Sequence, residues 1–209
     1  MATLILEDGT RYEGTLFGHK APVTGEVVFT TGMTGYQETL TDPSYCGQIV
    51  CMTYPLMGNV GINDIDSESA GVRMRGFIVS ELCDTPSNWQ MKKTLDQYLD
   101  EQGVTGLYGV DTRALTKILR EKGTMNGMIT TNEAYDLNEV LPKLKAYTTG
   151  KVVEKVTCKE KYVVNPTTDL AQNGPLSGAA RFDKEAYEKG VREPKPALVT
   201  ELSGQGLKV

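Results

Sequence analysis

One strand–helix–strand pattern constrains the fold more than any other feature of the sequence. Gly106–Val110 and Met125–Thr130 are short runs that predict strands, and Thr112–Lys122 between them predicts a helix with one apolar face. Asp111 is a favourable N-cap for this helix, and Gly123 ends it. Such a unit favours parallel pairing of its two strands with a right-handed crossover. We therefore expect an α/β fold.

The chain ahead of this unit predicts β-structure. Leu4–Leu6 and Arg11–Phe17 indicate a β-hairpin with its turn at Asp8-Gly9. Three further segments are rich in strand-forming residues, namely Glu26–Thr30, Gln48–Thr53 and Gly76–Ser80. We expect antiparallel β-structure early in the chain and α/β-structure later.

Two more helices are predicted on either side of the strand–helix–strand unit. Trp89–Asp100 has an apolar face, and Gly103 follows it. Leu137–Tyr147 follows Asp136, which is predicted to form a capping pair with Glu139. Pro142 lies inside the second helix and is expected to bend or shorten it.

The character of the sequence changes after Gly150. Residues 151–204 contain four prolines and little periodicity, which predicts a proline-rich connector. Residues 205–209 end in Gly-Leu-Lys-Val and resemble the start of a new strand. We therefore expect a domain at residues 1–150, a linker at 151–204, and the first strand of a further domain at 205–209.

Composition excludes several classes of protein. The net charge of −5 argues against a nucleic-acid-binding protein, which normally has a basic face. The N-terminus lacks the basic start and long apolar run of a signal peptide, and the sequence contains no apolar run long enough for a membrane span. The four cysteines have no C-x-x-C spacing, so a zinc site is not expected. A cytoplasmic protein with reduced thiols is the expectation.

Catalytic machinery is not evident. His19 is the only histidine and is expected to be an exposed loop residue, while Cys46 and Cys51 lie in β-rich runs and are expected to pack in the core. A hydrolase that uses Cys46 and His19 is therefore disfavoured. Met57–Asp64 has two glycines for a tight turn but is not a P-loop. Asp64–Gly71 is interpreted as a solvated acidic loop in preference to a cation site.

The stretch TGMTGYQETLTDPSYCGQIV predicts neither a regular helix nor a regular strand. It contains Asp42-Pro43-Ser44-Tyr45, which is typical of a type I turn with Ser44 at its apex. From spacing alone, Ser44 is interpreted as a cap of the turn, and a hydroxyl that contacts a ligand is the alternative. Gly32 and Gly35 suit a backbone that approaches another surface closely.

Two long blocks carry a resemblance to a known family. GEVVFTTGMTGYQETLTDPSYCGQIVCMTYPLMGNVGIND and DTRALTKILREKGTMNGMI resemble, in order and distance, the small chain of glutamine-hydrolysing carbamoyl-phosphate synthase. The resemblance covers residues 1–160 and implies a swivelling β/β/α-type domain. In the family this domain precedes a class I glutamine amidotransferase domain, whose Cys–His–Glu residues are expected beyond Val209.

The resemblance also implies a function. The family's small chain releases ammonia from L-glutamine, and the large chain uses it with bicarbonate and ATP to make carbamoyl phosphate for pyrimidine and arginine biosynthesis. No cofactor is expected in this chain, and ATP with a divalent cation is expected on the large chain. The expected partners are the large chain, the amidotransferase domain and glutamine, without nucleic acid or membrane.

The site residues carried over from the resemblance are few. Ser44 occupies the position of a serine that hydrogen-bonds glutamine across the domain interface, whereas Met33, Thr34, Gly35 and Tyr36 are expected at an interface or the ammonia path. No catalytic residue or metal ligand is expected in this chain, which alone should be inactive. A stand-alone binding or regulatory module is the alternative.

Overall fold

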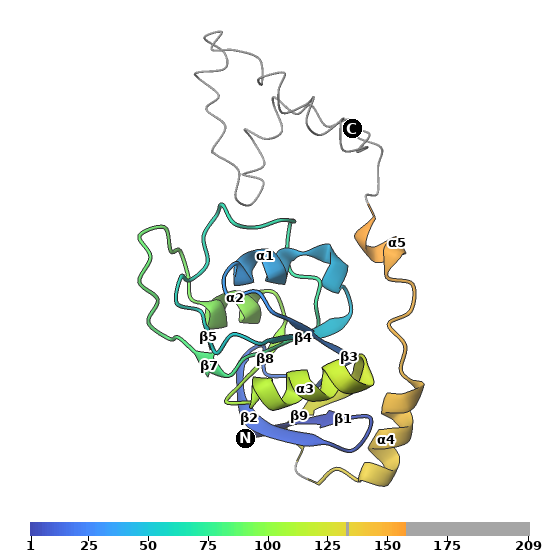
Figure 1. Ribbon diagram of the computed structural model, residues 1–209. Coiled ribbons are helices and arrows are strands. Elements are labelled where there is room, and N and C mark those ends of the chain that lie inside the picture. The colour runs from blue at the N-terminus through green and yellow to red at the C-terminus, as the bar shows by residue number, and fades with distance from the viewer. Residues whose placement is uncertain (133, 158–209) are drawn as a thin grey trace, which may run out of the picture. The chain divides into compact units, whose positions relative to one another are not determined.

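A closed barrel of seven strands forms the centre of the computed structural model, which describes residues 1–132 and 134–157 (Figure 1). The strands follow the order β1-β2-β8-β6-β4-β3-β9 around the barrel. Closure pairs both edges of every barrel strand. The barrel strands are β1 (Ala2–Leu6), β2 (Arg11–Gly18), β3 (Val23–Thr30), β4 (Gln48–Met52), β6 (Gly76–Ile78), β8 (Thr105–Tyr108) and β9 (Met125–Thr130).

The remaining elements lie outside the barrel sheet. β5 (Leu56–Met57) and β7 (Glu81–Leu82) form a separate parallel pair. The helices of the described residues are α1 (Tyr36–Thr41), the 3₁₀-helix η1 (Pro43–Tyr45), α2 (Leu95–Glu101), α3 (Thr112–Lys122), α4 (Leu137–Ala146) and α5 (Val153–Val156).

The predicted hairpin and strands are confirmed. β1 and β2 pair antiparallel, and the amide of Gly9 donates to the carbonyl of Leu6 at 2.9 Å in the turn between them. The three predicted strands in the middle of the chain correspond to β3, β4 and β6. The domain is therefore a mixed α/β fold, as its pattern of strands and helices indicates.

Strand pairing differs from the prediction in two respects. β8 and β9, the two strands of the strand–helix–strand unit, do not pair: β8 lies between β2 and β6, and β9 lies between β1 and β3. The chain directions around the barrel make β8 and β9 antiparallel to each other. The early half is also not purely antiparallel, because β3 pairs parallel with β4, and β4 with β6.

The packing of α3 gives the physical reason for this difference. Leu115 and Leu119 of α3 belong to the same apolar cluster as side chains from all seven barrel strands, and that cluster is the barrel interior. A crossover helix that returns the chain to a neighbouring parallel strand packs on the face of the sheet. Because α3 contributes side chains to the barrel interior instead, it connects two strands from different parts of the barrel wall. The helix itself is as predicted, because the Asp111 carboxylate accepts the Ala114 amide at 2.9 Å.

The predicted helix Trp89–Asp100 is too long at its start. α2 begins only at Leu95, and Thr94 caps it in a capping box with Gln97. Trp89 and Gln90 lie in a turn instead, in which the Met91 amide donates to the Asn88 carbonyl, and Lys93 forms a β-bridge with Ile62. Trp89 is 87% exposed and outside the helix.

The last described helix is close to its prediction. α4 continues past Pro142 to Ala146, one residue short of the predicted end. The Asp136 carboxylate caps it by accepting the Asn138 amide at 2.8 Å. The capping pair is therefore Asp136 with Asn138 and not with the predicted Glu139. α5 lies in the segment predicted as a linker. The linker from residue 158 and the strand predicted at 205–209 lie outside the described residues.

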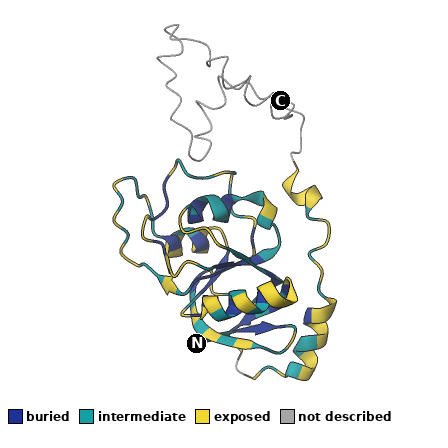
Figure 2. Ribbon diagram, viewed as in Figure 1, coloured by how far each residue is buried: buried dark blue, intermediate teal, exposed yellow. Residues whose placement is uncertain are grey.

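Two apolar clusters divide the core. The first fills the barrel, and the second packs side chains of β4 and β6 against α1 and α2 on the outer side (Figure 2). Gly106 of β8 shows how closely the second cluster packs, because a Cβ atom there would lie 2.4 Å from the ring of Phe17. Because successive residues of a strand point to opposite faces, strands such as β4 contribute side chains to both clusters.

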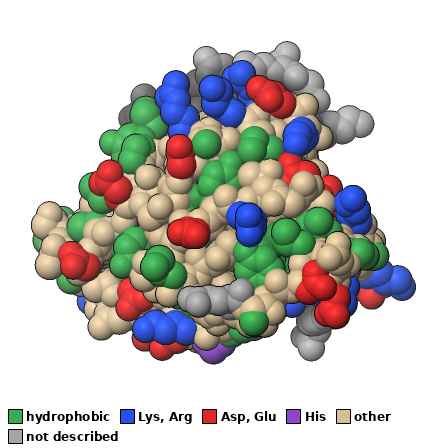
Figure 3. Space-filling view, turned by 90° about the horizontal axis from the view of Figure 1, so that it is seen from below, with side chains coloured by type: hydrophobic (Ala, Val, Ile, Leu, Met, Phe, Trp, Pro, Cys, Tyr) green, Lys and Arg blue, Asp and Glu red, His purple; other side chains and the backbone are tan. Residues whose placement is uncertain are grey.

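The surface carries both signs of charge. On the face drawn in Figure 3, acidic and basic side chains are interspersed among apolar ones. Among the described residues, no helix combines the length and the apolar character needed to span a membrane.

Candidate functional site

The turn that holds Ser44 is fixed by local hydrogen bonds and exposes Ser44 to solvent. Pro43–Tyr45 form a 3₁₀ turn in which the Tyr45 amide donates to the Asp42 carbonyl at 3.3 Å. One carboxylate oxygen of Asp42 accepts both the Ser44 amide, at 2.8 Å, and the Ser44 hydroxyl, at 2.6 Å. Ser44 is exposed. Asp42 therefore caps the turn and Ser44 donates to it, so the Ser44 hydroxyl oxygen retains lone pairs that can accept a further hydrogen bond.

The segment before this turn separates into an exposed and a buried part. Met33 and Thr34 are exposed, Gly35 has a φ of 75° and precedes α1, and Tyr36 is buried. The Tyr36 hydroxyl donates to the carbonyl of Gly61 at 2.6 Å, and burial raises the pKa of that hydroxyl strongly. α1 is a short helix that the sequence prediction missed.

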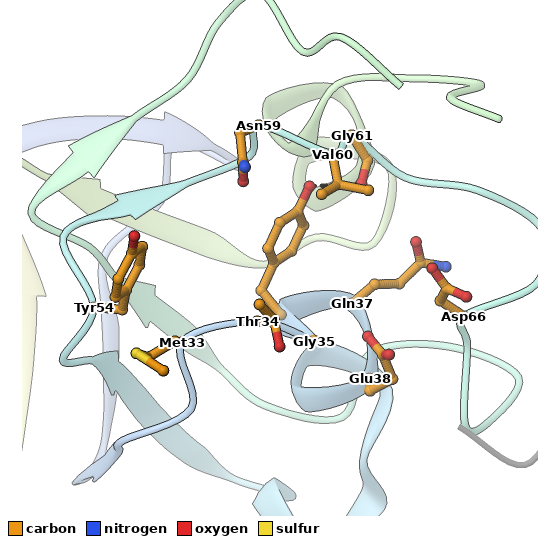
Figure 4. A pocket seen from close by; sticks show the side chains of 11 residues that line it. Met33, Thr34, Gly35, Gln37, Glu38, Tyr54, Asn59, Val60, Gly61 and Asp66 are labelled. Atoms are coloured by element: carbon orange, nitrogen blue, oxygen red, sulfur yellow. Dashed lines mark hydrogen bonds between the residues drawn. The ribbon is translucent and has the colours of Figure 1, made fainter. Parts of the chain in front are cut away.

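A cavity of about 220 Å³ lies beside α1 and brings the predicted interface residues together (Figure 4). Glu38 and Asp66 lie on one side of the cavity, and Met33 and Tyr54 lie on the other. Ser44 is not among the residues that line this cavity. The lining is Met33, Thr34, Gly35, Tyr36, Gln37, Glu38, Tyr54, Asn59, Val60, Gly61 and Asp66.

Gln37 fixes one wall of this cavity. Its side chain is 3% exposed, and its amide nitrogen donates to the Asn63 carbonyl at 2.7 Å while its amide oxygen accepts the Asn63 amide at 2.9 Å. The same nitrogen donates to the Ser67 hydroxyl at 2.9 Å. The Gln37 side-chain amide thus both donates to and accepts from the backbone of Asn63, as the backbone of a neighbouring strand would.

Thr41 makes a second attachment between α1 and the acidic loop. Its hydroxyl accepts the Glu68 amide at 2.9 Å, and its carbonyl accepts the Ser69 hydroxyl at 2.6 Å. Gln37 and Thr41 were not predicted as functional residues. The available signal was the spacing of Tyr36, Gln37, Leu40 and Thr41, which places them on one buried helix face.

The turn at Gly58–Gly61 and the neighbouring acidic loop supply further lining residues, among them Asp66. Gly58 and Gly61 have positive φ angles of 95° and 71°, as predicted, and the Gly61 amide donates to the Gly58 carbonyl at 3.0 Å. In the acidic loop, Asp66 accepts the side-chain amide of Asn63 at 2.7 Å. Within the described part of the chain, no three acidic, histidine or cysteine side chains are grouped so as to hold a metal ion.

The candidate nucleophiles have ordinary environments. His19 is exposed, as predicted, and lies 3.7 Å from the Asp100 carboxylate. Cys51 is fully buried in the barrel interior, where burial raises the pKa of its thiol to about 12. Cys46 is half-buried, so its packing in the core is only partial. Cys158 lies outside the described residues.

The sequence of the chain is similar to that of a known protein family over most of its length. A family profile described as carbamoyl-phosphate synthase small chain, CPSase domain, matches residues 4–129. The carbamoyl phosphate synthase small chain of Clostridium perfringens is 53% identical over 164 residues, which are 78% of this chain and 47% of that protein. That of Syntrophotalea carbinolica is 45% identical over 195 residues, 91% of this chain and 52% of that protein. The chain spans about half the length of these curated relatives.

Proposed function

The chain belongs to the family of carbamoyl-phosphate synthase small chains, and from that premise we propose that its barrel domain docks on the large chain and completes a glutamine site. In the proposed assembly, an amidotransferase domain hydrolyses L-glutamine. The large chain then combines the ammonia with bicarbonate, using ATP and a divalent cation, to form carbamoyl phosphate. The barrel domain breaks no bond in this scheme.

The exposed hydroxyl of Ser44 is the observation that carries the glutamine contact. The Asp42 carboxylate holds this hydroxyl through a 2.6 Å hydrogen bond, so the side chain is oriented before any ligand arrives. Ser44 donates its proton to Asp42 and can therefore accept a hydrogen bond from a donor such as the α-ammonium group of glutamine. A contact ordered in advance costs less side-chain entropy when the ligand binds.

The chain's own side chains support a positioning role over a hydrolytic one. Attack on the amide of glutamine needs an activated nucleophile beside a base. Cys51 is buried with a raised thiol pKa, and His19, the only histidine in the sequence, makes no hydrogen bond to a cysteine among the described residues. The proposed contribution of this chain is therefore binding and orientation of the substrate.

Replacement of Ser44 tests the glutamine contact. In an assembly of this chain with the large chain and an amidotransferase domain, Ser44→Ala is expected to raise the KM for glutamine about fivefold, equivalent to about 1 kcal/mol. Synthesis from added ammonium chloride should be unchanged, because that substrate bypasses the glutamine site. The matched control is Ser87→Ala, which removes another exposed hydroxyl and should leave the KM unchanged. An unchanged KM in Ser44→Ala would contradict the contact.

A further inference from the structure

The cavity beside α1 is bordered by large apolar side chains that are exposed to solvent. Met33 is 69% exposed, Tyr54 42% and Val60 38%, and all three line the cavity. Met and aromatic residues are enriched in protein interfaces, and exposed apolar side chains that gather around a hollow are unusual on a surface without a partner. This part of the surface therefore has the composition of a docking site.

The other side of the same cavity is acidic. Glu38 and Asp66 lie together there (Figure 4), and burial raises the pKa of Glu38, with the nearby charges of Asp66 and Glu68 adding to the rise. Within residues 1–132 and 134–157, no Lys or Arg lies within ion-pair distance of Glu38 or Asp66. Among these described residues, no positive charge therefore offsets the two carboxylates.

The apolar side and the acidic side of the cavity together suit an occupant that is apolar at one end and cationic at the other. A Lys or Arg side chain has an apolar stem and a cationic head, so it can lie along apolar surface with its charge at a polar end. The exposed ring of Tyr54 and the thioether of Met33 suit the stem, and the two carboxylates suit the head. A free inorganic cation would leave the exposed apolar side chains in water.

We propose that this cavity takes one arginine or lysine side chain from an apolar surface of the large chain. The inference rests on the proposed function, because it names the surface through which that docking takes place. Arginine is the better fit, since its planar guanidinium can bridge two carboxylates and arginine is enriched at interface centres.

The test compares dissociation constants for the large chain by sedimentation or calorimetry. The double variant Glu38→Gln/Asp66→Asn removes both charges and retains similar shapes, and its Kd is expected to rise about tenfold or more. Its binding should also depend less on salt concentration than that of the parent chain. The matched control, Glu121→Gln on α3 and outside the cavity, should bind as the parent does.

Two further measurements separate a lost contact from a damaged fold. Because the pKa of Glu38 is raised in the folded state, its ionised form opposes folding at neutral pH, so Glu38→Gln should unfold no more easily than the parent. Met33→Ala alters an exposed side chain and should weaken binding without changing the thermal unfolding curve.

Each outcome has a distinct meaning. If the parent binds the large chain and the double variant binds equally well, this inference is wrong and the proposed function stands. If the parent fails to bind at micromolar concentration, both are wrong. If the double variant instead abolishes self-association of this chain, the occupant is a second copy, and the inference is again overturned.

Discussion

The barrel interior and the wall of the cavity are stabilised by different forces. Inside the barrel, fully buried apolar side chains such as Ile49 and Leu107 pack together, with α3 contributing to the same cluster. Around the cavity, Gln37 and Thr41 attach the acidic loop to α1 through directional hydrogen bonds. Apolar burial is spread over many contacts, whereas the wall depends on a few bonds. A single substitution in the barrel interior should therefore destabilise the whole domain, whereas one at the cavity wall should loosen only the wall.

The largest expected effect is on the barrel. Ile49→Ala should lower the free energy of unfolding by about 2–5 kcal/mol, because it removes apolar area and leaves a cavity in a closed interior. Urea denaturation measures this loss, and Ile118→Ala on the half-buried face of α3 is the control with the smaller expected loss. A loss below about 1 kcal/mol for Ile49→Ala would show that the interior relaxes around the gap.

A smaller and more local effect is expected at the cavity wall. Gln37→Leu leaves the amide and carbonyl of Asn63 without their side-chain partner, at a cost of about 1–3 kcal/mol. Hydrogen exchange should show faster exchange of the amides of Asn63 and Glu68, with the barrel amides unaffected.

Gln48→Leu is the matched control, because its partner Glu26 is a side chain that can turn to water. The control should cost less than about 0.5 kcal/mol. Faster exchange throughout the barrel in Gln37→Leu would contradict the division into two regions.

The same contrast explains what the sequence could predict. The hairpin, the strands β3, β4 and β6, and the helix after Asp111 follow from local periodicity and caps, and all are confirmed. The choice of β2 and β6 as partners of β8, and of β1 and β3 as partners of β9, depends on closure of the barrel, which no local pattern encodes. A strand–helix–strand signal predicts the elements correctly and the partners of those strands incorrectly.

The site was predictable only in part. The turn at Ser44 follows from Asp42 and Pro43, whose local chemistry fixes it. The bond from Gln37 to Asn63, next to the acidic loop, joins residues 26 positions apart, and helix-face spacing marks Gln37 as buried without identifying its partner. The start of α2 was misplaced because an extended bridge at Lys93 competes with the helix, although Thr94 and Gln97 have capping-box spacing.

The most direct measurement is ammonia release from L-glutamine by the purified chain alone. If the chain only binds and orients glutamine, as proposed, it should release no ammonia above the uncatalysed background. Turnover that disappears in Cys46→Ala or His19→Ala would contradict this, because it would place bond breaking within the chain itself.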